Sequence, residues 1–194
     1  MTNHKLQILL GSASPRRRAL LAGLDLPFTA ITIETDESYP ADLQAGDIPY
    51  YISRAKARAY APNLTDDQLL ITADTIVWLD GRMLGKPHDE AEAIGMIQQL
   101  RNKTHQVYTA VTLAQKGQEL ETFVDRTDVT FGDLTDEEIA HYVQQYRPLD
   151  KAGAYGVQEW IGYVACTAMN GSYFNVMGFP VHRVYQALKK RGIV

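Results

Sequence analysis

Residues 12–17, which follow the apolar run 6–10, combine residue types that suit the binding of a phosphate group. Ser14 is a suitable helix N-cap, and Pro15 suits the first helical position, where its missing N–H costs no hydrogen bond. The first helical turn would then present free backbone N–H groups, serine hydroxyls and the guanidinium groups of Arg16 and Arg17. This combination predicts an anion site that includes Ser12 and Ser14, although the segment alone is also typical of a capped, solvated helix.

Asp74 is the acid whose surroundings are most unusual, because it lies within an otherwise apolar run, residues 69–79. Burying a carboxylate is costly unless a metal ion, a cation or several hydrogen-bond donors receive it. Two interpretations follow. Asp74 is either a structural residue that caps a turn or pairs with an arginine, or a metal ligand or general base for water.

Four further residues could contribute to such a site. Glu37 lies in an acidic, turn-prone stretch, and Lys56 lies on a predicted helix face that would by default be solvated. Lys86 is in a rigid Gly-Lys-Pro loop, and Gln158 follows a loop whose glycines permit close approach of a ligand. Cations for phosphates, carboxylates for Mg²⁺ and water, and an amide for a base together suit metal-assisted hydrolysis of a phosphoanhydride.

Composition limits the classes of protein to consider. The chain has 194 residues, 45% of them hydrophobic and 22% charged, and its formal net charge of −4 argues against a nucleic-acid partner. No apolar leader or bilayer-spanning run is present, so we expect a cytoplasmic protein without a membrane partner. The single cysteine, Cys166, is expected to be a buried small hydrophobe, and the five histidines are expected at the surface or at helix caps.

The elements that must position these residues follow from hydrophobic periodicity and capping signals. Strands are expected over residues 6–10, 28–33, 68–79, 106–114 and 120–131, with a break at 73–75 and a hairpin turn at 80–81. Helices are expected over residues 15–23, 47–61, 89–100, 135–146 and 180–190. Strand-like pieces are expected from residue 159 to residue 176. This order predicts a single α/β domain, 1–194, with a mixed sheet.

The motifs together resemble the Maf family of nucleoside triphosphate pyrophosphatases. The segments that carry the resemblance occur in the family's order and cover essentially the whole chain; they are Ser12–Arg17, Ala73–Thr75, Gly85–Pro87, Asp150–Gly156 and Asn170–Tyr173. The resemblance implies a mixed twisted sheet flanked by helices, with two lobes around a cleft, similar to inosine triphosphatase. It also implies a homodimer and a role in nucleotide-pool sanitation and cell division arrest.

The same resemblance assigns catalytic roles. It implies that Asp74 is the proton acceptor or a metal-associated carboxylate, and that Arg17, Glu37, Lys56 and Lys86 are the other catalytic residues. The cofactor is expected to be a divalent cation, Mg²⁺ or Mn²⁺, held by Asp74 and Glu37. The expected reaction releases pyrophosphate and a nucleoside monophosphate.

Substrate choice is implied by three further positions. Arg16, Thr75 and Gln158 match the specificity residues of the branch that prefers dTTP and UTP, and modified pyrimidine nucleotides are further candidate substrates. A glutamine amide can satisfy both a donor and an acceptor on a pyrimidine edge. One departure is Glu159, which with Trp160 replaces the glycine that commonly follows this glutamine. Two alternatives remain open: an N7-methyl-GTP pyrophosphatase, and a non-catalytic nucleotide-binding regulator of division.

Overall fold

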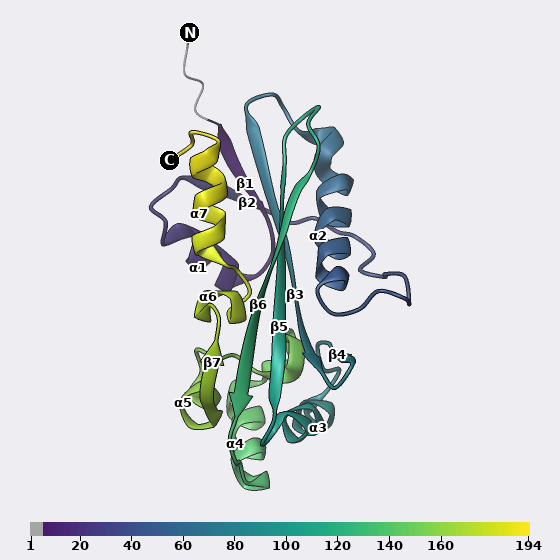
Figure 1. The fold of residues 1–194 in the computed structure, drawn as a ribbon, viewed down its shortest axis with the longest axis vertical. Coiled ribbons are helices and arrows are strands. Elements are labelled where there is room, and N and C mark those ends of the chain that lie inside the picture. The colour runs from purple at the N-terminus through teal and green to yellow at the C-terminus, as the bar shows by residue number, and fades with distance from the viewer. Residues whose placement is uncertain (1–5) are drawn as a thin grey trace. The chain divides into compact units, whose positions relative to one another are not determined.

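Strands and helices alternate along the first half of the chain in the computed structural model, which describes residues 6–194 (Figure 1). The strands are β1 (Gln7–Gly11), β2 (Phe28–Ile31), β3 (Gln68–Leu79), β4 (Arg82–Leu84), β5 (Thr104–Ala114), β6 (Glu121–Phe131) and β7 (Cys166–Asn170). The helices are α1 (Pro15–Ala22), α2 (Asp47–Tyr60), α3 (Glu90–Leu100), α4 (Asp136–Tyr146), α5 (Trp160–Ala165), α6 (Tyr173–Val176) and α7 (Val181–Lys190).

These strands form one mixed sheet in the order β2-β1-β3-β5-β6-β7, and β4 pairs with β3. β1 runs parallel to both β2 and β3, whereas β4 is antiparallel to β3 and β7 is antiparallel to β6. The prediction of an α/β fold with a mixed sheet flanked by helices is therefore confirmed.

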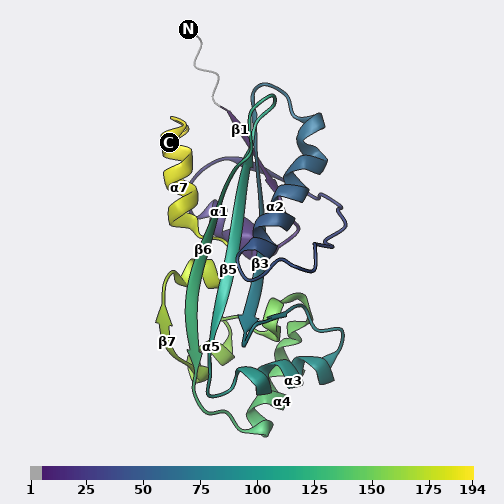
Figure 2. The ribbon, with the colours of Figure 1, turned by 45° about the vertical axis from the view of Figure 1, so that its right-hand side comes forward.

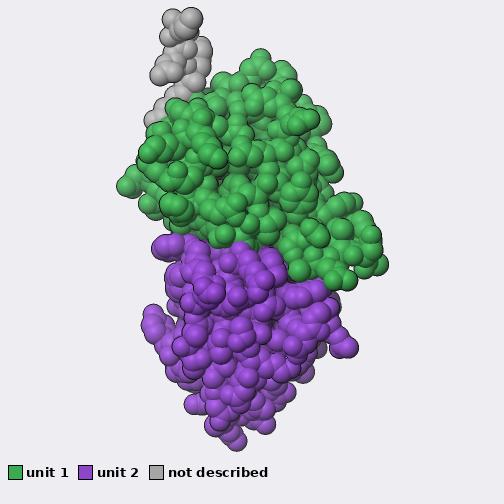
Figure 3. Space-filling model, in the orientation of Figure 1, with its two compact units in different colours: residues 1–74, 109–125, 178–194 green, residues 75–108, 126–177 purple. Residues whose placement is uncertain are grey.

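The chain divides into two compact units, shown in different colours in Figure 3. The first unit contains residues up to 74 together with 109–125 and 178–194, and the second contains 75–108 and 126–177. Three strands, β3, β5 and β6, contribute residues to both units. The cleft that the family resemblance implies stays a prediction.

In the first unit, alternate residues of β1 enter two different apolar clusters. Ile8 and Leu10 pack with Leu21 of α1 and with α7, whereas Leu9 packs with Ala57 of α2. This alternation is the period-two pattern of a strand that is buried on both faces. Figures 1 and 2 accordingly show α7 and α2 on opposite sides of these strands.

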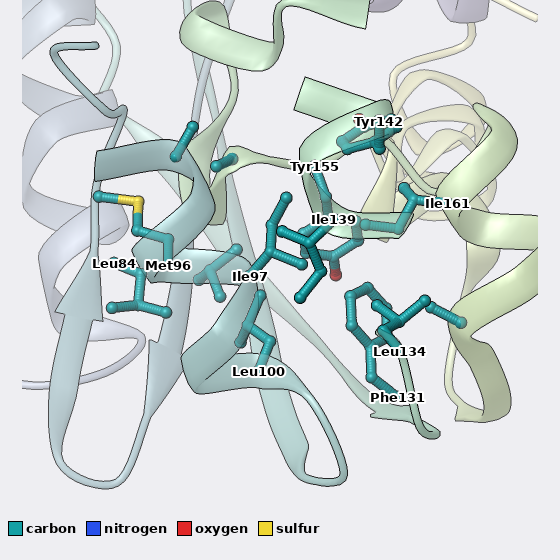
Figure 4. Packing of buried hydrophobic residues seen from close by; sticks show 14 of the residues in the cluster. Leu84, Met96, Ile97, Leu100, Phe131, Leu134, Ile139, Tyr142, Tyr155 and Ile161 are labelled. Atoms are coloured by element: carbon teal, nitrogen blue, oxygen red, sulfur yellow. The ribbon is translucent and has the colours of Figure 1, made fainter. Parts of the chain in front are cut away.

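The core of the second unit lies between α3, α4 and the ends of the long strands (Figure 4). Ile97 and Leu100 of α3 contribute to it, as do Ile139 and Tyr142 of α4, and all four are fully buried. Helix α4 begins with the capping box that the sequence predicts, because the Thr135 and Glu138 side chains each bond the other's backbone N–H.

Four predictions about local structure and burial are wrong. β3 is continuous through 73–75, because a cation satisfies the Asp74 carboxylate and the strand does not need to break. The stretch 159–176 contains two helices, α5 and α6, besides one strand, and helices of six and four residues are too short to show a 3.6-residue period. His105 is completely buried instead of exposed, and Cys166 is only partly buried.

The other histidines behave as expected where the structure describes them. His88, His141 and His182 are exposed, and His4 lies outside the described residues. Among residues 6–194, the structure contains no helix that is both long and apolar enough to cross a lipid bilayer.

Candidate active site

Lys56 joins the two acids that the sequence singled out. Its ammonium lies 2.9 Å from Asp74 Oδ1 and 2.8 Å from Glu37 Oε1. The Lys56 and Asp74 side chains are 11% and 13% exposed, whereas Glu37 is 53% exposed. The buried carboxylate of Asp74 is therefore paired with Lys56, and the predicted solvated position of Lys56 is wrong.

Hydrogen bonds made by buried hydroxyl groups hold α2 against β3 and β5 next to this pair. Thr72 lies two residues before Asp74, on the same face of β3, and its Oγ1 donates to the Ser53 carbonyl at 2.7 Å. Ser53 lies one helical turn before Lys56, and its hydroxyl is 2.9 Å from Thr112 Oγ1. The spacing along both elements thus brings Lys56 opposite Asp74.

Arg17 is held at the start of α1 by groups from three parts of the first unit. Its Nη1 donates to Ala73 O at 3.0 Å and to Ser12 Oγ at 3.4 Å, and its Nε donates to Gly178 O at 2.8 Å. Ser14 caps the helix as predicted, because its Oγ accepts from the Arg17 backbone N–H at 3.4 Å. The guanidinium group therefore lies beside the residue that precedes Asp74.

Burial and charge act in opposite directions on these groups. Burial raises the pKa of Asp74 above its ordinary value, although Lys56 and Arg17 oppose the rise. Burial likewise lowers the pKa of Arg17, and Asp74 opposes that change. Arginine starts from so high a pKa that its side chain stays charged at neutral pH. A carboxylate with a raised pKa is better suited to accept a proton.

The remaining predicted site residues are distributed over both units. Arg16 is on α1 beside Arg17, in the first unit, and is half-buried. Thr75 is half-buried in β3, Lys86 is exposed, and both belong to the second unit. Gln158, also in the second unit, has a buried Oε1 that accepts no hydrogen bond. The first unit thus brings together Ser12, Ser14, Arg17, Glu37, Lys56 and Asp74.

A family model described as Maf-like protein matches residues 7–191, which is nearly the whole chain. The chain belongs to the Maf-like protein family. Two relatives, from Bacteroides thetaiotaomicron and Phocaeicola vulgatus, are each named dTTP/UTP pyrophosphatase. They are 50% and 51% identical to this Maf-like chain over 187 residues, with 96% of each chain covered.

A solved structure confirms the fold of this Maf-like chain. The HAM1 protein from Coxiella burnetii superposes with a TM-score of 0.51, covering 95% of this chain and 99% of the other. Its sequence identity of 15% is low, so the likeness concerns the fold alone.

Two side chains of this Maf-like site, Asp74 and Glu37, carry the oxygen ligands that a divalent cation takes. Within residues 6–194, no group of three or more histidine, cysteine, aspartate or glutamate side chains is arranged to hold a metal ion. Asp74 and Glu37 nevertheless bring two carboxylates to one point, at Lys56 Nζ. Mg²⁺ is commonly bound by one or two carboxylates, with substrate phosphates and water completing its coordination.

Sequence reasoning missed the supporting residues of this Maf-like site, chiefly Ser53 and Thr112, which are both fully buried. A signal for them exists in the sequence. Ser53 falls at helical spacing from the apolar residues of 47–61, and Thr112 interrupts the apolar residues of 106–114. A small hydroxyl residue within a buried pattern indicates a hydrogen-bond partner on another element.

Proposed function

We propose that this protein hydrolyses dTTP and UTP, releasing pyrophosphate and the nucleoside monophosphate. The observation that carries the proposal is the Lys56 ammonium shared by Asp74 and Glu37, beside Arg17, in a chain half identical to dTTP/UTP pyrophosphatases. A buried acid with a raised pKa next to two cations suits water activation close to bound phosphate groups.

In the proposed reaction, water attacks the α-phosphorus and Asp74 accepts its proton. Arg17 and Lys56 stabilise the charge that develops on the leaving pyrophosphate, and Lys86 of the second unit is proposed as a further cation. Ser12 and Ser14 bind phosphate at the start of α1, where backbone N–H groups favour anions. Asp74 and Glu37 would hold Mg²⁺ or Mn²⁺, which when bound would neutralise charge and lower the pKa of water.

Recognition of the base is assigned to Gln158, with Arg16 and Thr75 as further specificity residues. The buried Oε1 of Gln158 lacks a hydrogen-bond donor, and an unpaired buried acceptor is costly. Uracil and thymine can supply an N–H donor on their pairing edge, whereas the matching position of cytosine is an acceptor. This complementarity supports a preference for UTP and dTTP over CTP.

We further propose a cytoplasmic homodimer that acts on nucleotide pools, with no nucleic-acid partner. The formal net charge of −4 supports the last point, because binding to a polyphosphate backbone depends on a positive surface. Size-exclusion chromatography with light scattering would test the dimer. A monomer at micromolar concentration would contradict it.

The decisive experiment measures pyrophosphate release from dTTP, UTP, CTP and N7-methyl-GTP with and without Mg²⁺ or Mn²⁺. Asp74→Asn should bind dTTP but lose about two to four orders of magnitude in kcat. Asp66→Asn is a matched control, because it removes the same charge at a side chain that is 90% exposed. Preference for N7-methyl-GTP would overturn the base assignment, and nucleotide binding without pyrophosphate release would indicate a regulator instead of an enzyme.

A further inference from the structure

A buried tyrosine of α4 holds the backbone turn that carries Gln158. The hydroxyl of Tyr142 accepts a hydrogen bond from the Gly156 backbone N–H at 3.0 Å, and Tyr142 has no exposed surface. The Gly156 carbonyl accepts from the Glu159 N–H at 2.9 Å. Both backbone polar groups of Gly156 are therefore used to close the turn 156–159.

Glu159 determines how the Tyr142 hydroxyl is oriented. The hydroxyl donates its proton to Glu159 Oε2, and this leaves its oxygen lone pairs for the Gly156 N–H. The other carboxylate oxygen, Oε1, lies 3.2 Å from the Lys151 ammonium. Lys151 is itself buried and also contacts Asp150 at 2.7 Å. The Glu159 carboxylate is thus fixed between a buried cation and a buried hydroxyl.

The Gln158 amide packs directly against this turn. A Cβ atom at position 156 would lie 2.7 Å from Gln158 Nε2 and 2.9 Å from Glu159 Cδ. Only glycine leaves room for both side chains, so the place of the Gln158 carboxamide depends on where Gly156 is held. The Oε1 atom of that carboxamide is the buried acceptor without a partner.

We propose that Tyr142 and Glu159 are positioning residues that set base selectivity by fixing the turn that carries Gln158. The inference rests on the proposed function, because it assigns selectivity to a pyrimidine read by Gln158. It also gives Glu159, the departure from the family pattern, a defined role, since its carboxylate is directed to Tyr142 and Lys151.

Loss of the Tyr142 hydroxyl has a direct structural consequence. Without it, the buried Gly156 N–H and the Glu159 carboxylate each lose a partner, and the turn must rearrange to satisfy them. Burial and Glu159 both raise the pKa of Tyr142, so the hydroxyl keeps its proton throughout the working range of pH. The network therefore acts by geometry and should not introduce a new pH dependence.

The test compares kcat/KM for UTP and CTP in Tyr142→Phe and Glu159→Ala. Each variant should reduce the UTP/CTP ratio about tenfold, mainly through a higher KM for UTP, because the selecting acceptor is displaced and the reacting groups are unchanged. Glu159→Gln keeps an acceptor for the hydroxyl and should retain most of the ratio. The double variant should lose no more than either single one, because both substitutions break one network.

Thr135→Ala is the matched stability control, since it removes the capping box of α4 and leaves the Tyr142 hydroxyl in place. If this variant reduces the ratio as much as Tyr142→Phe at an equal loss in Tm, the positioning role is refuted. Hydrogen exchange of the Gly156 amide gives a readout without substrate, and it should accelerate only in the network variants. An unchanged exchange rate overturns this inference alone, whereas a wild-type protein that hydrolyses no nucleoside triphosphate overturns the proposed function.

Discussion

Acid titration of His105 is expected to destabilise the folded protein in a way that one substitution can isolate. The imidazole is fully buried, its Nε2 lies 2.7 Å from Tyr155 Oη, and it packs edge-on against Phe131. Burial lowers the pKa of His105 from 6.5 to about 4. The folded protein therefore resists protonation at a site that the unfolded chain protonates readily.

The sign and size of the effect follow from the two pKa values. Below pH 6.5 the unfolded state binds a proton at this residue that the folded state does not bind, so stability falls as the pH falls. Each pH unit between the two pKa values lowers the free energy of unfolding by about 1.4 kcal/mol. The interval from pH 6.5 down to a folded pKa of about 4 therefore lowers it by about 3 kcal/mol. Above pH 7 the contribution is constant.

The assay is urea denaturation of the wild type and His105→Gln at pH 7, 6, 5 and 4. Glutamine can hydrogen-bond to Tyr155 but does not titrate, so the variant should lose about 3 kcal/mol less than the wild type between pH 7 and pH 4. His182→Gln, at an exposed histidine, controls for the loss of a titrating ring. Equal acid destabilisation of the wild type and His105→Gln would refute the reasoning.

Three further predictions concern the first unit. Lys56→Met removes the cation nearest Asp74, so the acid limb of the kcat/KM profile should move about one pH step upward; an unmoved limb would mean that Asp74 is not the titrating base. Thr72→Val deletes the hydrogen bond to Ser53 O, so it should lower the free energy of unfolding by about 1 kcal/mol and reduce kcat, with KM unchanged. Chemical denaturation and steady-state kinetics measure these effects, and no change in either would mean that the bond is irrelevant. Arg17→Lys cannot reproduce three side-chain hydrogen bonds, so we expect a lower Tm and weaker dTTP binding by calorimetry; wild-type values for both would contradict its assigned position.

Local structure was predictable from the sequence where residues of the same short segment supply its hydrogen bonds. The serine cap of α1 and the capping box of α4 depend on residues three apart, and both form as predicted. The Asp80-Gly81 hairpin also forms, with both residues at positive φ, which the residue types at that turn favour. Such features need no knowledge of the remaining chain.

The candidate site was only partly predictable, because its contacts join distant segments. The pattern around Lys56 looked like a solvated helix face, since its partners come from residues 18 and 19 positions away. The same missing information produced the expected break in β3: an acid in an apolar strand disrupts it unless a partner is supplied from elsewhere. Family resemblance identified the residues, but the Thr72–Ser53 contact that holds them became visible only in three dimensions.

The first unit is built from three separate stretches of the chain, and this determines when it can fold during synthesis. Phe179, Val184 and Leu188 complete the cluster around β1, and Gly178 O binds Arg17. A nascent chain on the ribosome therefore cannot complete this core, or form the hydrogen bond from Arg17 to Gly178 O, until residues 178–188 have emerged. Contacts of such long sequence separation form late, so an incomplete chain would present the residues that are proposed to bind phosphate without the core that aligns them.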